Sequence, residues 1–477
     1  MVNIIQTYTT LPFNKQSNMK KIKNIFIFII LLCLSSCTKA DLSDCWSHRN
    51  DAFPHNNSQE SISEEEMLEN ETKMGIERSD GLKYLLQNDE YYVWGCYEKF
   101  EKLTIPDTYK GKPVVGIMWQ EGLSFTADEL VELYLGKNIR GLSSSSFWRN
   151  KLLTKILIDE NNEYYEVIDD VLYLTNTNSN IYPCSLIWVL PSKTGELNIK
   201  EGVGPFDDGC LKYANNVTKI KIPDSMPDPT LDRNYSFPNF TFCESLEKFI
   251  ISNNNLNFQV VDGILYSKEG KTIIAYPQGK RGNFAIPEMV RTIYPACFNG
   301  AFLNVLLLNS YVQIDKTTFA NTRIQSLICD DNNQLYSSYD GCLYSKDMSV
   351  FLYSPSEKVT IKINNNTKEI NNLVNEQITL LDIPDGVVSI DYLHLPNLQQ
   401  LILGKELKQI KEKAFSWHKK IDKVFYKGSK NDLQSIVLGD NNPSLVHSTR
   451  FFYSEKPPKV SGQYWHYING KPVVWDK

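Results

Sequence analysis

Histidine is the first residue type to consider for catalysis or metal binding in this chain of 477 residues. None of its six histidines stands in the His-Glu-x-x-His spacing of a helical zinc site; they are His48, His55, His394, His418, His447 and His466. The sequence also lacks a Gly-x-Ser-x-Gly nucleophile turn and a phosphate-binding P-loop. We therefore expect no enzyme, no catalytic residue, no metal site and no cofactor.

Clustered carboxylates suggest a second kind of chemistry, calcium binding. Asp330-Asp331-Asn332-Asn333 and the Asp of Asp262-Gly263 have suitable oxygen ligands. Neither segment has the central glycine and the distal glutamate of a calcium loop. The pattern therefore favours turns, in which Asp and Asn side chains bond their own backbone.

One cysteine near the N-terminus is a candidate for covalent modification. Met19-Lys20-Lys21-Ile22-Lys23 is basic, and an apolar run follows from Ile25 to Leu34. The next residues, Leu34-Ser35-Ser36-Cys37, resemble a bacterial lipobox. We interpret residues 1–36 as a lipoprotein signal peptide with translation starting at Met19, and we expect Cys37 to carry the lipid. Residues 37–80 are polar and acidic, which predicts a flexible tether.

The other eight cysteines form no Cys-x-x-Cys pair. An exported chain could form disulfides. We expect most of these thiols to be buried and free, because Cys297 and Cys329 fall on positions where the pattern below requires small apolar residues.

The elements that would position any site are built from a sequence repeat. Leu303, Leu306 and Leu308 recur 21 positions later as Ile324, Leu327 and Cys329. By the same spacing Tyr311 matches Val290 and Phe319 matches Phe298. The same spacing of three apolar residues, here called core slots, recurs at Leu130/Leu133/Leu135, Leu153/Ile156/Ile158, Val217/Ile220/Ile222, Leu246/Phe249/Ile251, Ile378/Leu381/Ile383, Leu398/Leu401/Leu403 and Ile421/Val424/Tyr426. A chain that revisits fixed apolar positions predicts a solenoid of short parallel strands.

The repeats resemble a known family. The Ile-Pro step follows the strand at Ile222-Pro223, Ile286-Pro287 and Ile383-Pro384, and an aromatic step occurs at Cys297-Phe298 and Ala414-Phe415. With the core slots, these steps resemble the BspA-type leucine-rich repeats of bacterial surface proteins. The resemblance implies a mainly β leucine-rich-repeat solenoid over residues 103–426. It indicates function only weakly, because solenoids perform many unrelated binding tasks.

A second motif interrupts the repeats. It reads Asp169-Asp170-Val171-Leu172-Tyr173, Asp262-Gly263-Ile264-Leu265-Tyr266 and Asp340-Gly341-Cys342-Leu343-Tyr344. Asp-Gly before alternating apolar residues is typical of a tight turn into a β-hairpin. We expect hairpins inserted between blocks of coils.

Both ends of the solenoid should be capped by hairpins. Residues 81–102 are rich in aromatic residues around a turn at Asn88-Asp89. Residues 427–477 end in two apolar runs joined by Asn469-Gly470, a strong hairpin pattern. These hairpins would cover the exposed strand edges at the two ends.

The candidate binding site is the outward strand face. We use this name for the residue between the last two core slots of each strand, which points away from the core. Seven of these residues are apolar: Tyr134, Leu157, Ile250, Leu307, Ile328, Ile402 and Phe425. They either pack beneath hairpins or a neighbouring chain, or they form a stripe that binds a partner.

Two functions remain open. The first is a surface protein for recognition or adhesion, with an extracellular protein or host matrix as ligand. The alternative is a carbohydrate-binding lipoprotein of a polysaccharide-uptake system. The aliphatic face favours a protein ligand. The net charge of −6 argues against nucleic acid. We expect the protein in the cell envelope, held by its lipid alone, on the outer membrane and facing outward.

Overall fold

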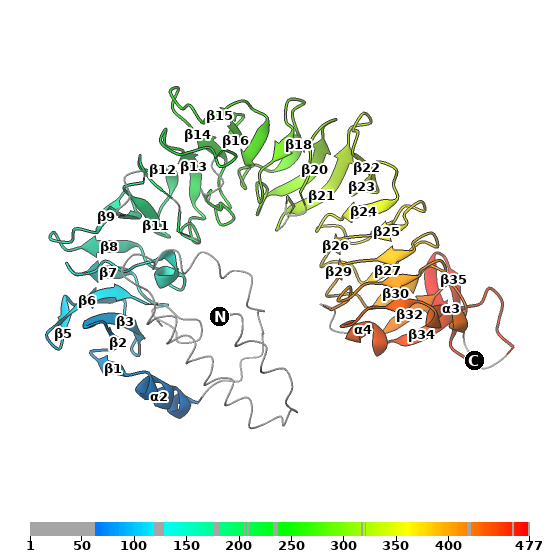
Figure 1. Ribbon diagram of the computed structural model, residues 1–477, viewed down its shortest axis with the longest axis horizontal. Coiled ribbons are helices and arrows are strands. Elements are labelled where there is room, and N and C mark those ends of the chain that lie inside the picture. Colours follow the sequence, from blue (N-terminus) through cyan, green and yellow to red (C-terminus); the bar gives the residue numbers. More distant parts are fainter. Residues whose placement is uncertain are drawn as a thin grey trace, which may run out of the picture. The chain divides into compact units, whose positions relative to one another are not determined.

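The computed structural model describes residues 63–475 except 119–127, 176, 178–181, 205, 208, 232–236, 316–317, 320, 417–420 and 460–461. The predicted signal peptide, Cys37 and most of the predicted tether lie outside the described residues. The chain forms two units, residues 1–70 and 71–477. The second unit carries the described strands, which follow one another along it in chain order (Figure 1).

The predicted core slots form the interior of the solenoid. All of them are buried except Ile158 and Ile251, which are half-buried. Strand β20 (Phe302–Leu308) pairs in parallel with β21 (Arg323–Cys329), so that Leu306 faces Leu327 and Leu308 faces Cys329. The 21-residue spacing in the sequence is therefore one turn of the coil. One predicted match is wrong: Tyr311 is 53% exposed, and its neighbour Val312 fills the core in its place.

Four parallel sheets contain the main strands of the coils. In chain order, the four are β4 (Lys102–Ile105), β7 (Glu132–Leu135) and β8 (Lys155–Ile158); β12 (Gly195–Asn198), β13 (Val217–Lys221) and β14 (Lys248–Ile250); β18 (Gly282–Ala285), β20 and β21; and β27 (Leu380–Asp382), β30 (Gln400–Leu403), β32 (Lys423–Tyr426) and β34 (Thr449–Tyr453). Each strand contributes only a few residues, so its backbone groups are satisfied by the coils before and after it.

Shorter strands form further parallel ladders beside the main ones. In one ladder β25 (Glu369–Ile370), β28 (Ser389–Ile390), β31 (Gln409–Ile410) and β33 (Val437–Leu438) pair in that order. In another, β26 (Leu373–Val374) pairs with β29 (Leu393–His394). A further short strand, β19 (Thr292–Ile293), is the edge of a separate sheet.

The described residues contain four antiparallel three-stranded meanders. Three of them confirm the predicted inserted hairpins; the third strand was also expected after the second and third motifs but not after the first. They are β9 (Tyr165–Ile168), β10 (Val171–Leu174) and β11 (Ser185–Val189); β15 (Phe258–Val261), β16 (Ile264–Ser267) and β17 (Thr272–Ala275); and β22 (Tyr336–Tyr339), β23 (Cys342–Ser345) and β24 (Val350–Tyr353).

The fourth meander opens the solenoid. It comprises β1 (Ile76–Ser79), β2 (Leu82–Gln87) and β3 (Glu90–Cys96). Its first turn, Asp80-Gly81, has positive φ angles of 50° and 77°, and the turn at Asp262-Gly263 has the same pair of values. Positive φ at both positions matches the twist of the flanking strands and favours Gly, Asn and Asp. All four meanders also carry a register shift before an equivalent tyrosine, namely Tyr84, Tyr173, Tyr266 or Tyr344. The predicted N-terminal cap is therefore one more copy of the inserted unit.

This first meander starts earlier than predicted. Helix α2 (Glu64–Lys73) and strand β1 lie in the segment predicted to be a flexible tether. Glu71 is only 2% exposed and its carboxylate contacts Lys83 Nζ at 2.6 Å and Arg78 at 2.7 Å. Lys83 occupies the position of a buried leucine, Leu265 or Leu343, in other meanders. The buried charge is retained there because Glu71 neutralises it.

After β4, the hairpin of β5 (Thr108–Tyr109) and β6 (Lys112–Ile117) joins the first meander, because β6 pairs with β3. A short 3-10 helix, Ser144–Phe147, precedes β8. It places Phe147, which is 1% exposed, against Trp188 of the second meander at 5.6 Å between ring centroids.

At the C-terminus the solenoid runs further than residue 426. Strand β33 pairs in parallel with β31, and β34 pairs in parallel with β32. Helix α3 (Lys430–Gln434) precedes β33, and helix α4 (Pro443–Val446) lies between β33 and β34. The predicted terminal hairpin then follows as β35 (Tyr464–Ile468) and β36 (Lys471–Val474), joined by Asn469-Gly470. The boundary at 426 was wrong because the last coil carries helices and departs from the apolar spacing.

Buried asparagines tie neighbouring coils together. The Asn309 amide donates to the carbonyls of Pro287 and Val290 in the preceding coil, and its oxygen accepts from the backbone of Tyr311 and Val312. Asn333 and Asn375 make equivalent bonds, and both are at most 1% exposed. Asp330 accepts from the Asn332 backbone. The Asp-Asn segment is thus a turn, as its sequence predicted.

Candidate functional site

The strand pairing arranges the outward strand face into rows. Tyr134 lies opposite Leu157, and Leu307 lies opposite Ile328. Ile250 lies opposite Lys221, and Ile402 opposite Phe425. The pairing thus places the apolar residues side by side in three of the four sheets, and in the remaining sheet Ile250 lies beside a lysine.

The exposure of these rows differs sharply. Leu157 and Ile328 are 38% and 43% exposed, which is high for aliphatic residues in paired strands. Tyr134, Ile250 and Leu307 are half-buried. Ile402 and Phe425 are each 1% exposed and are therefore not part of an accessible face. For these two residues the expected surface position was wrong.

The C-terminal hairpin buries that last row. Trp465 packs on Phe425 with ring centroids 5.2 Å apart, and its indole donates to the Tyr426 carbonyl at 3.0 Å. Phe451 of β34 also stacks on Phe425, with ring centroids 5.4 Å apart. The Tyr467 hydroxyl donates to Asp382 at 2.7 Å. These contacts come from residues far along the chain, so the local pattern around Ile402 and Phe425 could not indicate them.

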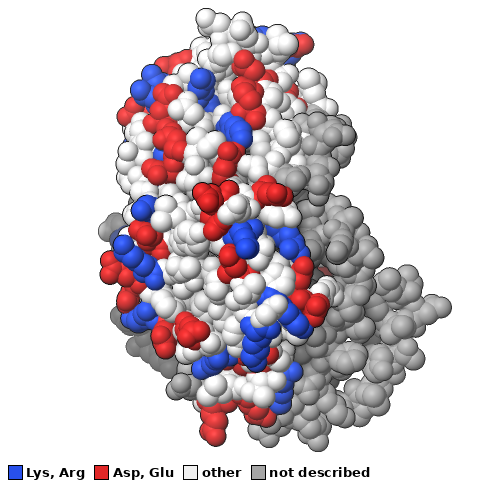
Figure 2. Space-filling model, turned by 90° about the vertical axis from the view of Figure 1, so that its left-hand side faces the viewer, with Lys and Arg blue, Asp and Glu red and all other residues white. Residues whose placement is uncertain are grey.

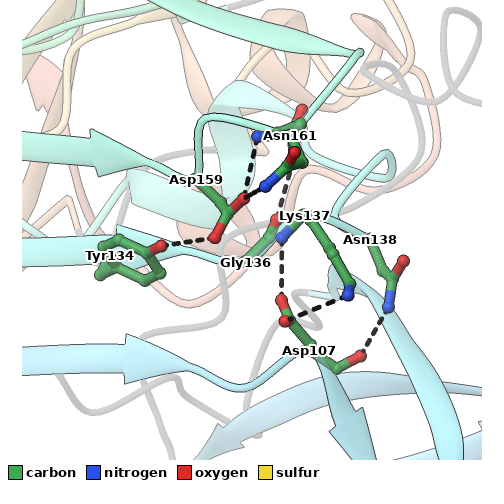
Figure 3. A network of polar contacts seen from close by, with 8 residues as sticks. Asp107, Tyr134, Gly136, Lys137, Asn138, Asp159 and Asn161 are labelled. Atoms are coloured by element: carbon green, nitrogen blue, oxygen red, sulfur yellow. Dashed lines mark hydrogen bonds and ion pairs between the residues drawn. The ribbon is translucent and has the colours of Figure 1, made fainter.

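Tyr134 belongs to a polar network at the ends of strands β4, β7 and β8 (Figure 3). Its hydroxyl donates to Asp159 at 2.7 Å, and this bond raises the pKa of Tyr134. The Asn161 backbone N–H and the Tyr134 hydroxyl together lower the pKa of Asp159. On the preceding coil Asp107 accepts from the Lys137 backbone at 2.9 Å. Tyr134 is therefore held in place at its hydroxyl.

A charged and aromatic row lies at the start of β18, β20 and β21, and the sequence analysis did not identify it. The guanidinium groups of Arg281 and Arg323 lie 5.6 and 5.0 Å from the centroid of the Phe302 ring. The one signal in the sequence was Phe302, an aromatic residue at a position outside the core spacing, immediately before the core slot Leu303. We call Arg281, Phe302 and Arg323 the arginine row.

The remaining candidate groups are clusters of His, Cys, Asp and Glu side chains. Among the residues that the structure describes, no group of three or more His, Cys, Asp or Glu side chains could hold a metal ion. The seven described cysteines are all buried, as expected for most of them. Burial raises the pKa of Cys243 to about 12, which suits an inert thiol.

Charge is mixed rather than concentrated. On the face drawn in Figure 2, acidic and basic side chains of the described residues alternate with neutral ones, without a large area of one sign. In the described part of the chain, no helix is both long and apolar enough to cross a membrane.

Comparison with solved structures finds several repeat proteins. A leucine-rich cell surface protein from Faecalibacterium prausnitzii A2-165 is 15% identical, with a TM-score of 0.31, over 76% of this chain and 97% of its own. A leucine-rich repeat protein from Eubacterium ventriosum ATCC 27560 is 14% identical, with a TM-score of 0.30, over 83% and 98%. One from Bacteroides ovatus ATCC 8483 is 15% identical, with a TM-score of 0.29, over 79% and 99%.

A family model gives the more specific result. No curated protein matches the sequence. The model for the BspA type leucine rich repeat region matches in six copies, over residues 275–392 and 343–442. The matched segment contains β20, β21, β27, β30 and β32, whose core slots are buried as the repeat requires. Residues 275–442 therefore match the BspA type leucine rich repeat region, within a mainly β solenoid.

Proposed function

We propose that this protein is a non-enzymatic binding protein of the cell envelope, anchored by a lipid on Cys37, and that its outward strand face contacts an extracellular protein or matrix ligand. The observation that carries the proposal is the exposure of Leu157 and Ile328, at 38% and 43%, within paired strands. Exposed apolar residues in ordered strands are typical of interaction sites. Tyr134, Ile250 and Leu307 extend the face.

Replacing Leu157, Ile250 and Leu307 together with serine tests this proposal. We expect a melting temperature within a few degrees of the wild type, because none of the three is a core slot. We expect cells that display the variant to lose most of their adhesion to immobilised matrix proteins, since a few apolar anchors carry most of the energy of an interface.

The matched control replaces Leu256 and Val359 with serine. Both are apolar and more exposed, at 80% and 68%, but lie outside the main strands. Adhesion should persist in this control. Full adhesion of the triple variant would show that the partner does not use the strand face.

The lipid anchor is tested separately by Cys37→Ala. This variant should leave the membrane fraction and become soluble, because a lipidated cysteine is the proposed attachment point. Unchanged membrane attachment of Cys37→Ala, with the same processing as the wild type, would refute the anchor.

Carbohydrate binding is the second candidate, as part of a polysaccharide-uptake system. The His466 and Trp475 rings stack at 3.7 Å on the terminal hairpin, and the Trp475 indole donates to the Ser454 carbonyl at 2.8 Å. An aromatic ring fixed in this way is suited to stacking on a sugar. Binding to a glycan array that disappears in Trp475→Ala, with no binding to matrix proteins, would favour this candidate.

A further inference from the structure

The two arginines of the arginine row differ in their ion pairs. Arg323 pairs with Glu357 at 3.0 Å, and Glu244 also acts on it electrostatically. Arg281 is exposed, and among the described residues it forms no ion pair. Both guanidinium groups lie over the same aromatic ring, but only Arg323 has a carboxylate bound to it. Arg281 can therefore take a further carboxylate without displacing one of the protein's own.

Phe302 supports the arginines rather than the core. It is half-buried, whereas the next residue, Leu303, is fully buried. An arginine that lies over an aromatic ring can still donate N–H groups at its edge and loses less conformational freedom on binding. The row is thus arranged to present donors outward.

The same strands carry two apolar residues, Leu307 and Ile328, at the end opposite to the arginine row. Leu307 and Ile328 pair across β20 and β21 near their carboxyl ends, and Phe302 and Arg323 pair at the start. Five residues separate the two positions on each strand, which corresponds to about 17 Å at the rise of a β-strand. Figure 1 shows β18, β20 and β21 side by side.

We propose that β18, β20 and β21 bind a protein partner that presents a carboxylate to Arg281 and Arg323 and an aliphatic side chain to Leu307 and Ile328, about 17 Å apart. The inference rests on the proposed function and names the partner's chemistry. A protein fits better than an acidic polysaccharide, because Leu307 and Ile328 need an apolar counterpart. In an extended peptide the two groups would be four or six residues apart, because side chains on one face of a strand recur at every second residue.

The experiment uses two labelled peptides and the full-length protein. One carries two glutamates, four serines and two leucines in that order, and the other has lysines in place of the glutamates. By fluorescence anisotropy, the wild type should bind the acidic peptide at least tenfold more tightly. Arg281→Glu should reduce this preference to less than twofold. Because surface charges are screened, added salt should weaken wild-type binding.

Arg291→Glu is the matched control. Arg291 also lies over an aromatic ring, Tyr311, at 4.6 Å, but outside the arginine row. The Arg291→Glu variant should prefer the acidic peptide as strongly as the wild type does. Equal affinity of the wild type for both peptides, or an undiminished preference in Arg281→Glu, would overturn the proposal. So would polygalacturonate binding that requires Arg281 in the absence of acidic-peptide binding.

Failure of the acidic-partner proposal can be distinguished from failure of the proposed function by comparing the adhesion of two variants. If the serine triple variant loses adhesion while Arg281→Glu adheres fully, the strand face remains the binding surface and only the acidic partner is wrong. If Arg281→Glu alone loses adhesion, the arginine row is supported and the aliphatic face is not the main contact.

Discussion

The sheets β18-β20-β21 and β27-β30-β32-β34 have the same kind of outward residues but different surroundings. Ile328 of the first sheet is 43% exposed, whereas Phe425 of the second is 1% exposed. The difference comes from the terminal hairpin, whose Trp465 covers Phe425. An apolar residue facing outward from a repeat strand therefore has two meanings, a covered internal layer or an open surface, and only tertiary contacts separate them.

The largest effect should come from the core side of the open sheet. Leu306 is fully buried between β18 and β21, so Leu306→Asp should destabilise the protein by about 4 kcal/mol or more, because an unpaired charge is left in an apolar interior. Chemical denaturation followed by circular dichroism measures this effect.

Ile328→Asp is the matched control on the outward side of the neighbouring strand. We expect a change within about 0.5 kcal/mol, as for other surface substitutions. Similar losses in both variants would mean that the outward strand face of this sheet is also internal.

The covered sheet should depend on its hairpin. Trp465 is fully buried and bonds the Tyr426 carbonyl, so Trp465→Ala should cost about 3–5 kcal/mol. Trp475→Ala on the same hairpin removes a half-buried ring and should cost clearly less. Protease cleavage near Ile402 and Phe425, read by mass spectrometry, should increase in Trp465→Ala alone. Equal resistance in the two variants would show that the hairpin is not what protects this sheet.

The sequence could predict the coil because the coil is local. Leu303, Leu306 and Leu308 recur at a fixed spacing, and each must face the same core in each turn. The inserted hairpins were predictable for the same reason, since Asp-Gly sets both the turn and the register. These features need no information from distant residues.

What the sequence did not show depends on contacts between distant segments. Residues 64–80 are polar and predicted a tether, but Glu71 neutralises Lys83 of the next strand. The arginine row was missed because Arg281, Phe302 and Arg323 come together only when three coils stack. The burial of Ile402 depends on a hairpin more than sixty residues later. For the outward strand face, the sequence therefore predicted which residues are apolar, but not which of them are exposed to solvent.

The smallest effect should come from the polar edge of the covered sheet. The Tyr467 hydroxyl donates to Asp382 at 2.7 Å, and Asp382 also pairs with Lys427 at 2.8 Å. Tyr467→Phe removes this single bond while keeping the ring, so the free energy of unfolding should fall by about 1 kcal/mol at pH 7. Urea denaturation of both proteins measures the difference.

The pH dependence of that difference identifies the bond. Burial and the Asp382 carboxylate raise the pKa of Tyr467 above its ordinary value. A raised pKa means that the folded state holds the proton more tightly, so the stabilisation is complete below the unfolded pKa of about 10 and is lost as pH rises above it. The advantage of wild type over Tyr467→Phe should therefore be constant from pH 6 to pH 9 and shrink by pH 11. An advantage that grows with pH would show that Tyr467 ionises more readily in the folded hairpin, contrary to a bond with Asp382.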